Sequence, residues 1–158
     1  VQDRVMALSA IHRYLYLARK LSKVRADSLL DDIIKQLVTI GALDEVDHRI
    51  DISTSFDPVE INPDQSVPLS LLATEAAINA VKHCGVERGS PCGINIALKQ
   101  TGTDTLCLSI VNSRSTDEGT ETDTRDTDGS GLGSRLIQSF VSQLDGTLET
   151  SMTDDRYE

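Results

Sequence analysis

The sequence has few aromatic residues and no tryptophan, and it contains no secretory signal peptide and no apolar run long enough to span a bilayer. Its three cysteines, Cys84, Cys92 and Cys107, are an odd number without metal-ligand spacing. We therefore expect free thiols, a cytoplasmic location and no membrane contact. The sequence does not begin with Met and starts inside an amphipathic pattern, so we expect it to be a segment of a larger protein.

The excess of negative charge limits the classes of partner. The formal net charge is −10 over 158 residues, which argues against nucleic acid or an anionic membrane unless a local basic patch exists. The candidate patch lies near the N-terminus and consists of Arg13, Arg19, Lys20, Lys23 and Arg25. Such a run is more typical of the solvated face of an amphipathic helix. We expect no nucleic-acid partner.

The hydrophobic periodicity predicts alternating helices and strands. In chain order, the expected elements are a helix over 2–21, a helix from Asp27 or Ser28 to about 40, strands over 48–56 and 59–61, a turn over 62–64, a helix over 66–83, strands over 94–98 and 106–111 around a hairpin turn, a polar loop over 112–128, a helix over 133–143, a turn at Asp145-Gly146 and a strand over 147–152. This order predicts an α+β fold, a two-layer sandwich of a mixed sheet covered by helices on one face.

The predicted helix 66–83 carries an unusual polar stripe. Because an α-helix turns by about 100° per residue, one side of this otherwise apolar helix presents Glu75, Asn79, Lys82 and His83. Polar groups set into an apolar surface need partners, and a metal–phosphate ligand would satisfy all four. Taken alone, the stripe is more typical of a solvated helix face.

A glycine-rich segment precedes the next predicted helix. The run is Gly129-Ser130-Gly131-Leu132-Gly133. Glycines at a helix start allow the backbone to approach a phosphate, and the helix N–H groups point toward the anion. The run differs from a dinucleotide-binding fingerprint, since a polar loop and not a strand precedes it, and no Lys-Ser/Thr of a Walker motif follows.

Together, the two segments resemble the ATP-binding domain of histidine kinases. The stripe helix matches the N box, roughly E-x-x-x-N-A-x-K-H, and the glycine run resembles the second glycine box. The stretches 4–8 and 11–16, with the ending Lys82-His83, look like the HWE and related subfamily of bacterial sensor kinases. The tryptophan signature of the strict HWE group is missing. The resemblance covers nearly the whole chain and implies a Bergerat-type fold.

The resemblance also implies roles for individual residues. Asn79 would coordinate the Mg²⁺ that bridges the ATP phosphates, and Glu75 would hold that metal through water or act as a general base. Lys82 and His83 would face the phosphates. The phosphate side would be bordered by Gly129, Gly131, Leu132 and Gly133, with residues 113–128 as an ATP lid.

The first glycine box departs from the family pattern. The family has D-x-G-x-G, whose Asp accepts a hydrogen bond from the adenine amino group, whereas the aligned run here is Asn112-Ser113-Arg114-Ser115-Thr116. The carbonyl oxygen of Asn112 can still accept that bond. Both glycines of that pattern are replaced, and this departure bears on the geometry of the lid and on the affinity for ATP.

The histidines of the segment do not match a phosphoacceptor. His12 precedes Arg13, but Tyr16 stands where the family's acceptor motif has Asn, and His48 is expected at the surface. The acceptor His is therefore expected upstream of Val1. The resemblance divides the chain into residues 1–24, the second helix of a dimerisation and phosphotransfer hairpin, and residues 25–158, the catalytic domain.

Three functions remain open at this point. The first is the catalytic region of a sensor histidine kinase, which uses MgATP, an upstream sensor (PAS- or LOV-like) with its acceptor helix, and a response regulator. The second is another ATP-dependent protein kinase or ATPase of the same fold, such as an anti-sigma-factor kinase. The third is a degenerate phosphotransfer or docking module that has lost ATP binding.

Overall fold

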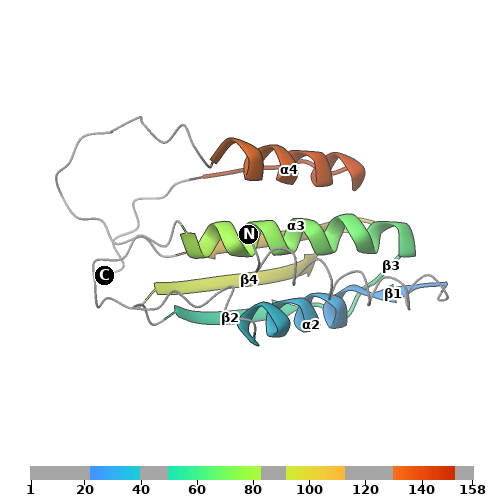
Figure 1. Ribbon diagram of the computed structural model, residues 1–158. Coiled ribbons are helices and arrows are strands. Elements are labelled where there is room, and N and C mark those ends of the chain that lie inside the picture. Colours follow the sequence, from blue (N-terminus) through green and yellow to red (C-terminus); the bar gives the residue numbers. More distant parts are fainter. Residues whose placement is uncertain (1–21, 40–49, 83–91, 113–129, 152–158) are drawn as a thin grey trace.

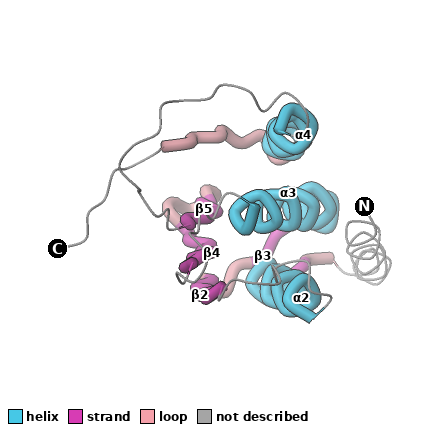
Figure 2. The backbone as a smooth tube through the Cα atoms, turned by 60° about the vertical axis from the view of Figure 1, so that its left-hand side comes forward, coloured by secondary structure: helices cyan, strands magenta, loops and turns pink. Residues whose placement is uncertain are grey.

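A computed structural model describes residues 22–39, 50–82, 92–112 and 130–151 of the chain (Figure 1). The structure has a layer of strands and a layer of helices on one face of them (Figure 2). This is the α+β sandwich that the sequence predicts. No helix within the described residues is both long and apolar enough to cross a membrane.

The main sheet contains three strands. Strand β4 (Cys92–Gln100) lies between β2 (Ile50–Phe56) and β5 (Leu106–Asn112). It runs parallel to β2 and antiparallel to β5, so the sheet is mixed. The β4–β5 connection is the predicted hairpin turn, in which the N–H of Thr101 donates to the carbonyl of Thr105 at 3.0 Å.

A two-stranded sheet closes one end of the molecule. Strand β1 (Val24–Arg25) pairs antiparallel with β3 (Glu60–Ile61). The periodicity predicts β3 but contains no sign of β1, because a two-residue strand is defined by its distant partner. Strand β1 leads directly into α2 (Ala26–Thr39), whose first N–H donates to the carbonyl of Val59 at 2.9 Å.

The helix layer consists of α2, α3 (Pro63–Lys82) and α4 (Ser130–Gln143). Helix α3 lies between α2 and α4 in Figure 2. Helices α2 and α3 run in the same direction, and α4 returns alongside α3 in the opposite direction (Figure 1). The C-terminal end of α3 and the N-terminal end of α4 therefore lie at the same end of the molecule.

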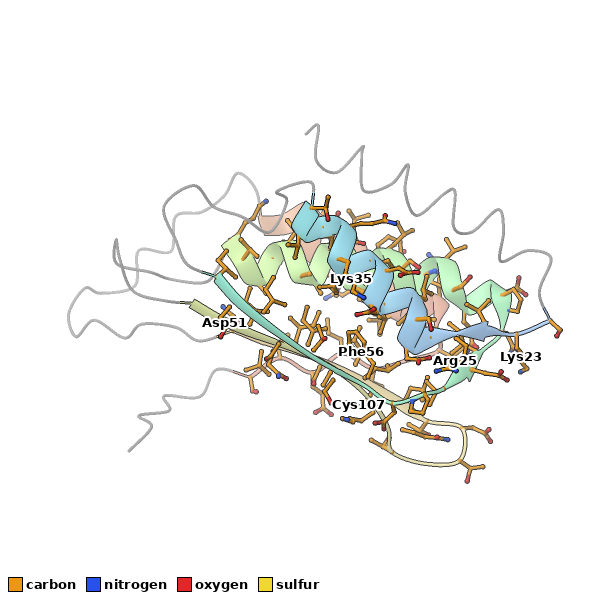
Figure 3. All side chains as sticks on the ribbon, turned by 90° about the horizontal axis from the view of Figure 1, so that it is seen from below. Lys23, Arg25, Lys35, Asp51, Phe56 and Cys107 are labelled. Carbon is orange, nitrogen blue, oxygen red and sulfur yellow. The ribbon has the colours of Figure 1, made fainter. Side chains whose placement is uncertain are left out.

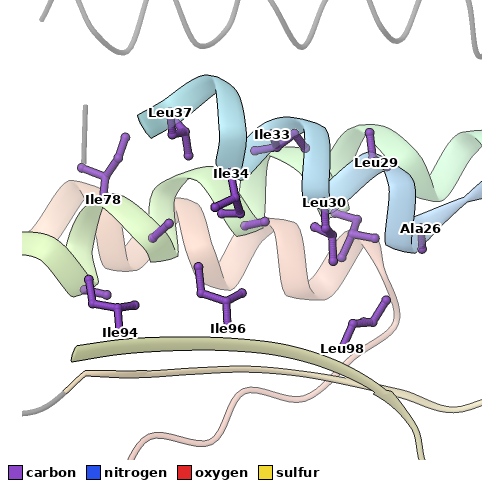
Figure 4. Packing of buried hydrophobic residues seen from close by; sticks show 14 of the residues in the cluster. Ala26, Leu29, Leu30, Ile33, Ile34, Leu37, Ile78, Ile94, Ile96 and Leu98 are labelled. Atoms are coloured by element: carbon purple, nitrogen blue, oxygen red, sulfur yellow. The ribbon is translucent and has the colours of Figure 1, made fainter. Parts of the chain in front are cut away.

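The core lies between the sheet and the helices (Figure 4). Alternate residues of β4 point toward the helices, as the period of two in a strand requires, and these are Ile94, Ile96 and Leu98. Apolar residues on one face of α2 and on α3 cover them, namely Leu29, Leu30, Ile33, Ile34, Leu37, Ala73, Ala77, Ile78 and Val81. This apolar layer fixes α3 on the sheet.

Helix α3 begins earlier than the sequence predicts. The expected turn over 62–64 is instead the helix start, with Pro63 in the first helical position, where its missing N–H costs nothing. The N–H of Asn62 donates to the side-chain oxygen of Gln65 at 3.0 Å, which is one half of a capping box. The predicted start at residue 66 is wrong because it overlooked this capping pattern.

The end of the described chain also differs from the prediction. The turn after α4 is confirmed: the N–H of Gly146 donates to Val141 at 3.0 Å, and Asp145 has a φ of 53°. This pattern is a Schellman motif. The predicted strand over 147–152 is wrong for its described part, since residues 147–151 form no strand and pair with none. The predicted helix 2–21 lies outside the described residues.

Candidate functional site

The predicted site residues that the structure describes come from three elements that meet at one end of the molecule. Helix α3 ends there at Lys82, β5 ends there at Asn112, and α4 begins there at Ser130 (Figure 1). The hydrophobic core positions each element, because α3 lies on the inward face of the sheet and α4 lies on α3. The fold thus gathers residues that are far apart in the sequence.

Asn79 and Gly133 lie close together in the folded chain. A Cβ atom built on Gly133 would lie 3.3 Å from Nδ2 and 3.5 Å from Oδ1 of Asn79. Gly133 is buried, and Asn79, one turn before the end of α3, is half-buried. The polar stripe of α3 and the glycine-rich segment, which are separate in the sequence, therefore lie against each other in the folded chain.

Glu75 lies one helical turn before Asn79 on the same side of α3. The side chain is half-buried, and its Oε2 atom is inaccessible to solvent. The site thus has a carboxylate at its inner end and the carboxamide of Asn79 closer to the end of the helix. Lys82, the last residue of α3, is exposed and places an ammonium group at the outer end.

Asn112 is the last residue of β5. It lies opposite Ile94 in the antiparallel register. Opposite residues of paired strands share one face of a sheet, and Ile94 is buried under the helices. Asn112 is therefore on the helix-covered face, where it is half-buried, at the same end of the fold as Asn79 and Lys82.

The start of α4 makes this end of the molecule suitable for an anion. The helix has 14 residues, and its N-terminus lies beside the C-terminal end of α3. The free N–H groups of a first helical turn carry partial positive charge and attract phosphate oxygens. Gly131 and Leu132 belong to this turn. Lys82 adds a full positive charge at the same end.

The structure does not describe every predicted site residue. His83, Gly129 and the lid over 113–128 lie outside the described residues, as do His12 and His48. Of the cysteines, Cys107 is an exposed free thiol, as expected. The described residues therefore bear on Glu75, Asn79, Lys82, Asn112 and the first turn of α4.

The donor set fits a hydrated magnesium ion bound together with a nucleotide. Among the described residues, no three His, Cys, Asp or Glu side chains gather as an all-protein metal site. Mg²⁺ at nucleotide sites is typically held by only one or two protein oxygens, with phosphate oxygens and water as the other ligands. Glu75 and Asn79 offer oxygen ligands of this kind on one face of α3.

Two carboxylates with lowered pKa values, Asp27 and Asp57, lie away from this end. A side-chain hydrogen bond from Arg25 lowers the pKa of Asp27. The backbone N–H of Gln100, followed by the Lys99 side chain, lowers the pKa of Asp57. Figure 3 shows Lys23 and Arg25 beside the two-stranded sheet. Asp51, near the start of β2 and at the end that holds the candidate site, lies at the opposite end of the molecule.

The predicted basic patch is only partly described. Lys23 donates to the side chain of Asn62 at 2.8 Å, and Arg25 is paired with Asp27. Arg25 belongs to β1, so its assignment to a helix face is wrong. Both described cations of the predicted patch therefore have structural partners.

The comparisons with known proteins concern the fold. No protein-family model matches the sequence, and no curated protein matches it. Solved structures do resemble it, among them the histidine kinase domain of a blue-light activated histidine kinase from Erythrobacter litoralis, with a TM-score of 0.64 and 17% identity. The match covers 89% of this chain and 63% of that one.

A second match is the Erythrobacter litoralis blue-light activated histidine kinase itself, with a TM-score of 0.62 and 18% identity over 95% of this chain and 49% of that one. The chain thus spans less than two thirds of either structure. At these identities the likeness is one of fold. The chain has an α+β fold like that of this histidine kinase domain.

Proposed function

We propose that the chain is the ATP-binding catalytic region of a two-component sensor histidine kinase. The observation that carries the proposal is the closeness of Gly133 to the Asn79 carboxamide at the end of the fold where Asn112 also lies. The Asn79 carboxamide, the N-terminus of α4 and Asn112 belong to three different elements, and all lie at this end of the fold. A solvated polar stripe on one helix would not require such convergence.

In this proposal, different residues would bind different parts of the nucleotide. Asn79 and Glu75 would hold Mg²⁺, Lys82 and His83 would face the phosphates, and Asn112 would accept a hydrogen bond from the adenine amino group. Bound Mg²⁺ would neutralise phosphate charge. The glycine-rich start of α4 would direct backbone N–H groups at the phosphates, which favours the reaction by positioning and charge neutralisation.

The reaction would be phosphoryl transfer to an imidazole. A nitrogen of an upstream His would attack the γ-phosphorus, an N–P bond would form, and the bond to the bridging oxygen would break with release of ADP. An Asp of a response regulator would then receive the phosphoryl group. Residues 1–24 would be the second hairpin helix and residues 25–158 the catalytic domain, joined to an upstream sensor in a cytoplasmic protein.

The experiment that tests this proposal uses the protein that includes the residues upstream of Val1, incubated with γ-labelled ATP. We expect label that is stable to base and labile to acid, which is the behaviour of a phosphohistidine. Replacement of Asn79 by Ala should remove it. If the protein hydrolyses ATP but acquires no such label, it is an ATPase of this fold. If it neither binds nor hydrolyses ATP, it is a degenerate phosphotransfer or docking module that has lost ATP binding.

A further inference from the structure

We infer that Gly133 is a positioning residue for the magnesium ligand: it holds the Asn79 carboxamide in place by allowing the first turn of α4 to lie directly against it. The inference rests on the proposed function and assigns Gly133 a role beyond bordering the phosphates. In this role, the first turn of α4 packs against the Asn79 side chain and limits where the metal ligand can lie. The metal-dependent part of nucleotide binding would then depend on a residue that never touches the metal.

The contact distances support this role. A Cβ on Gly133 would lie 3.3 Å from Nδ2 of Asn79, 3.5 Å from Oδ1 and 3.9 Å from Cγ. All three nearest atoms thus belong to one carboxamide group, and the first distance is shorter than an ordinary van der Waals contact. A methyl group at position 133 would therefore press on the amide of Asn79, which would have to move by a few tenths of an ångström.

The backbone conformation does not explain why glycine is at this position. Gly133 lies within α4 and does not have the positive φ that favours glycine. Inside a helix, glycine is less favourable than alanine because it loses more conformational freedom on folding. What glycine provides here is room, since the absence of a Cβ lets α4 lie close to the Asn79 side chain.

The expected effect follows from the geometry that magnesium requires. Mg²⁺ demands near-ideal octahedral coordination at short distances, so a displacement of one ligand by a few tenths of an ångström matters. A methyl group at position 133 would cause such a displacement of Asn79. Binding of ATP without metal does not use the Asn79 oxygen, so it would lose less affinity than binding of MgATP.

The test measures ATP binding by calorimetry to the 158-residue chain, once with excess Mg²⁺ and once with EDTA. Gly133→Ala should weaken binding with Mg²⁺ about two- to tenfold, the factor that corresponds to pushing one side chain off its preferred rotamer. The loss of affinity should be smaller in EDTA, where the Asn79 oxygen has no metal to bind. Gly102→Ala is the matched control, because a Cβ there meets only Thr105 at 3.5 Å and lies in the distant hairpin turn.

A second variant keeps the test valid if Gly133→Ala changes the stability of the chain. Asn79→Ser removes the carboxamide that the new methyl group would displace but keeps a side-chain oxygen for the metal, so the Mg²⁺-dependent affinity that remains should not fall further when Gly133→Ala is added. An equal loss in both backgrounds, or an equal loss with Mg²⁺ and with EDTA, would overturn the inference and leave the proposed function standing. Absence of ATP binding by the unmodified chain would overturn both.

Discussion

The core residue Ile96 gives the sharpest test of how the fold positions the site. Ile96 lies in the middle of the central strand β4, is 1% exposed, and points toward α2 and α3 (Figure 4). Ile96→Ala removes three carbon atoms, which is about 2.4 kcal/mol of transfer free energy at about 0.8 kcal/mol per group. The cavity left behind raises the expected loss of unfolding free energy to about 3–4 kcal/mol.

Urea denaturation followed by circular dichroism measures this loss. Because small domains have unfolding free energies of about 5–15 kcal/mol, the midpoint should fall steeply while the m-value stays the same. Val111→Ala is the matched control: Val111 is also β-branched and on the neighbouring strand, but it is 60% exposed. Its expected cost is below about 1 kcal/mol. Equal costs for both variants would refute the account of which sheet face the helices cover.

Two further predictions concern Asp57 and Asn112. The N–H of Gln100 and the Lys99 side chain lower the pKa of Asp57 from its ordinary value of 3.8, so the stability that this carboxylate adds is present above that value and is lost as the pH falls through the lower, folded-state pKa. In denaturation experiments, the difference in unfolding free energy between the unmodified chain and Asp57→Asn should therefore shrink as the pH falls below about 4. A difference that does not depend on pH would contradict this. Asn112→Ala should weaken MgATP binding about five- to tenfold by removing one hydrogen bond, whereas Asn112→Asp should retain binding because it keeps an acceptor. A fluorescence titration measures the three affinities, and equal binding by all three chains would argue against adenine contact at Asn112.

The fold could be predicted from the sequence wherever a pattern is local. The alternation in Ile94-Asn95-Ile96-Ala97-Leu98 and the apolar spacing of α2 identify β4 and α2 without tertiary information. Strand β1 could not be predicted, since its two residues are a strand only through pairing with β3. The wrong strand over 147–152 has the same cause: alternation favours an extended backbone, but a strand also needs a partner.

In the candidate site, too, local features could be predicted from the sequence, whereas features that depend on tertiary packing could not. The spacing of Glu75, Asn79 and Lys82 on one side of α3 follows from helix geometry alone. The closeness of Gly133 to Asn79 could not be read from the sequence, because it depends on α4 returning antiparallel along α3. The position of Asn112 likewise depends on the register of β5 against β4. Motif recognition provided the residues, and tertiary packing determines which of them meet.

MgATP binding by the 158-residue chain, compared with that of Asn79→Ala, tests the central claim most directly. Asn95→Ala is the matched control, because Asn95 is exposed on the outer face of β4, where its side chain donates to Ser53 at 2.9 Å. We predict binding by the unmodified chain and by the Asn95 variant, and its loss in the Asn79 variant, since the metal would lose a ligand. Equal binding by all three chains, or by none, would contradict the assignment of this end of the fold as a magnesium–ATP site.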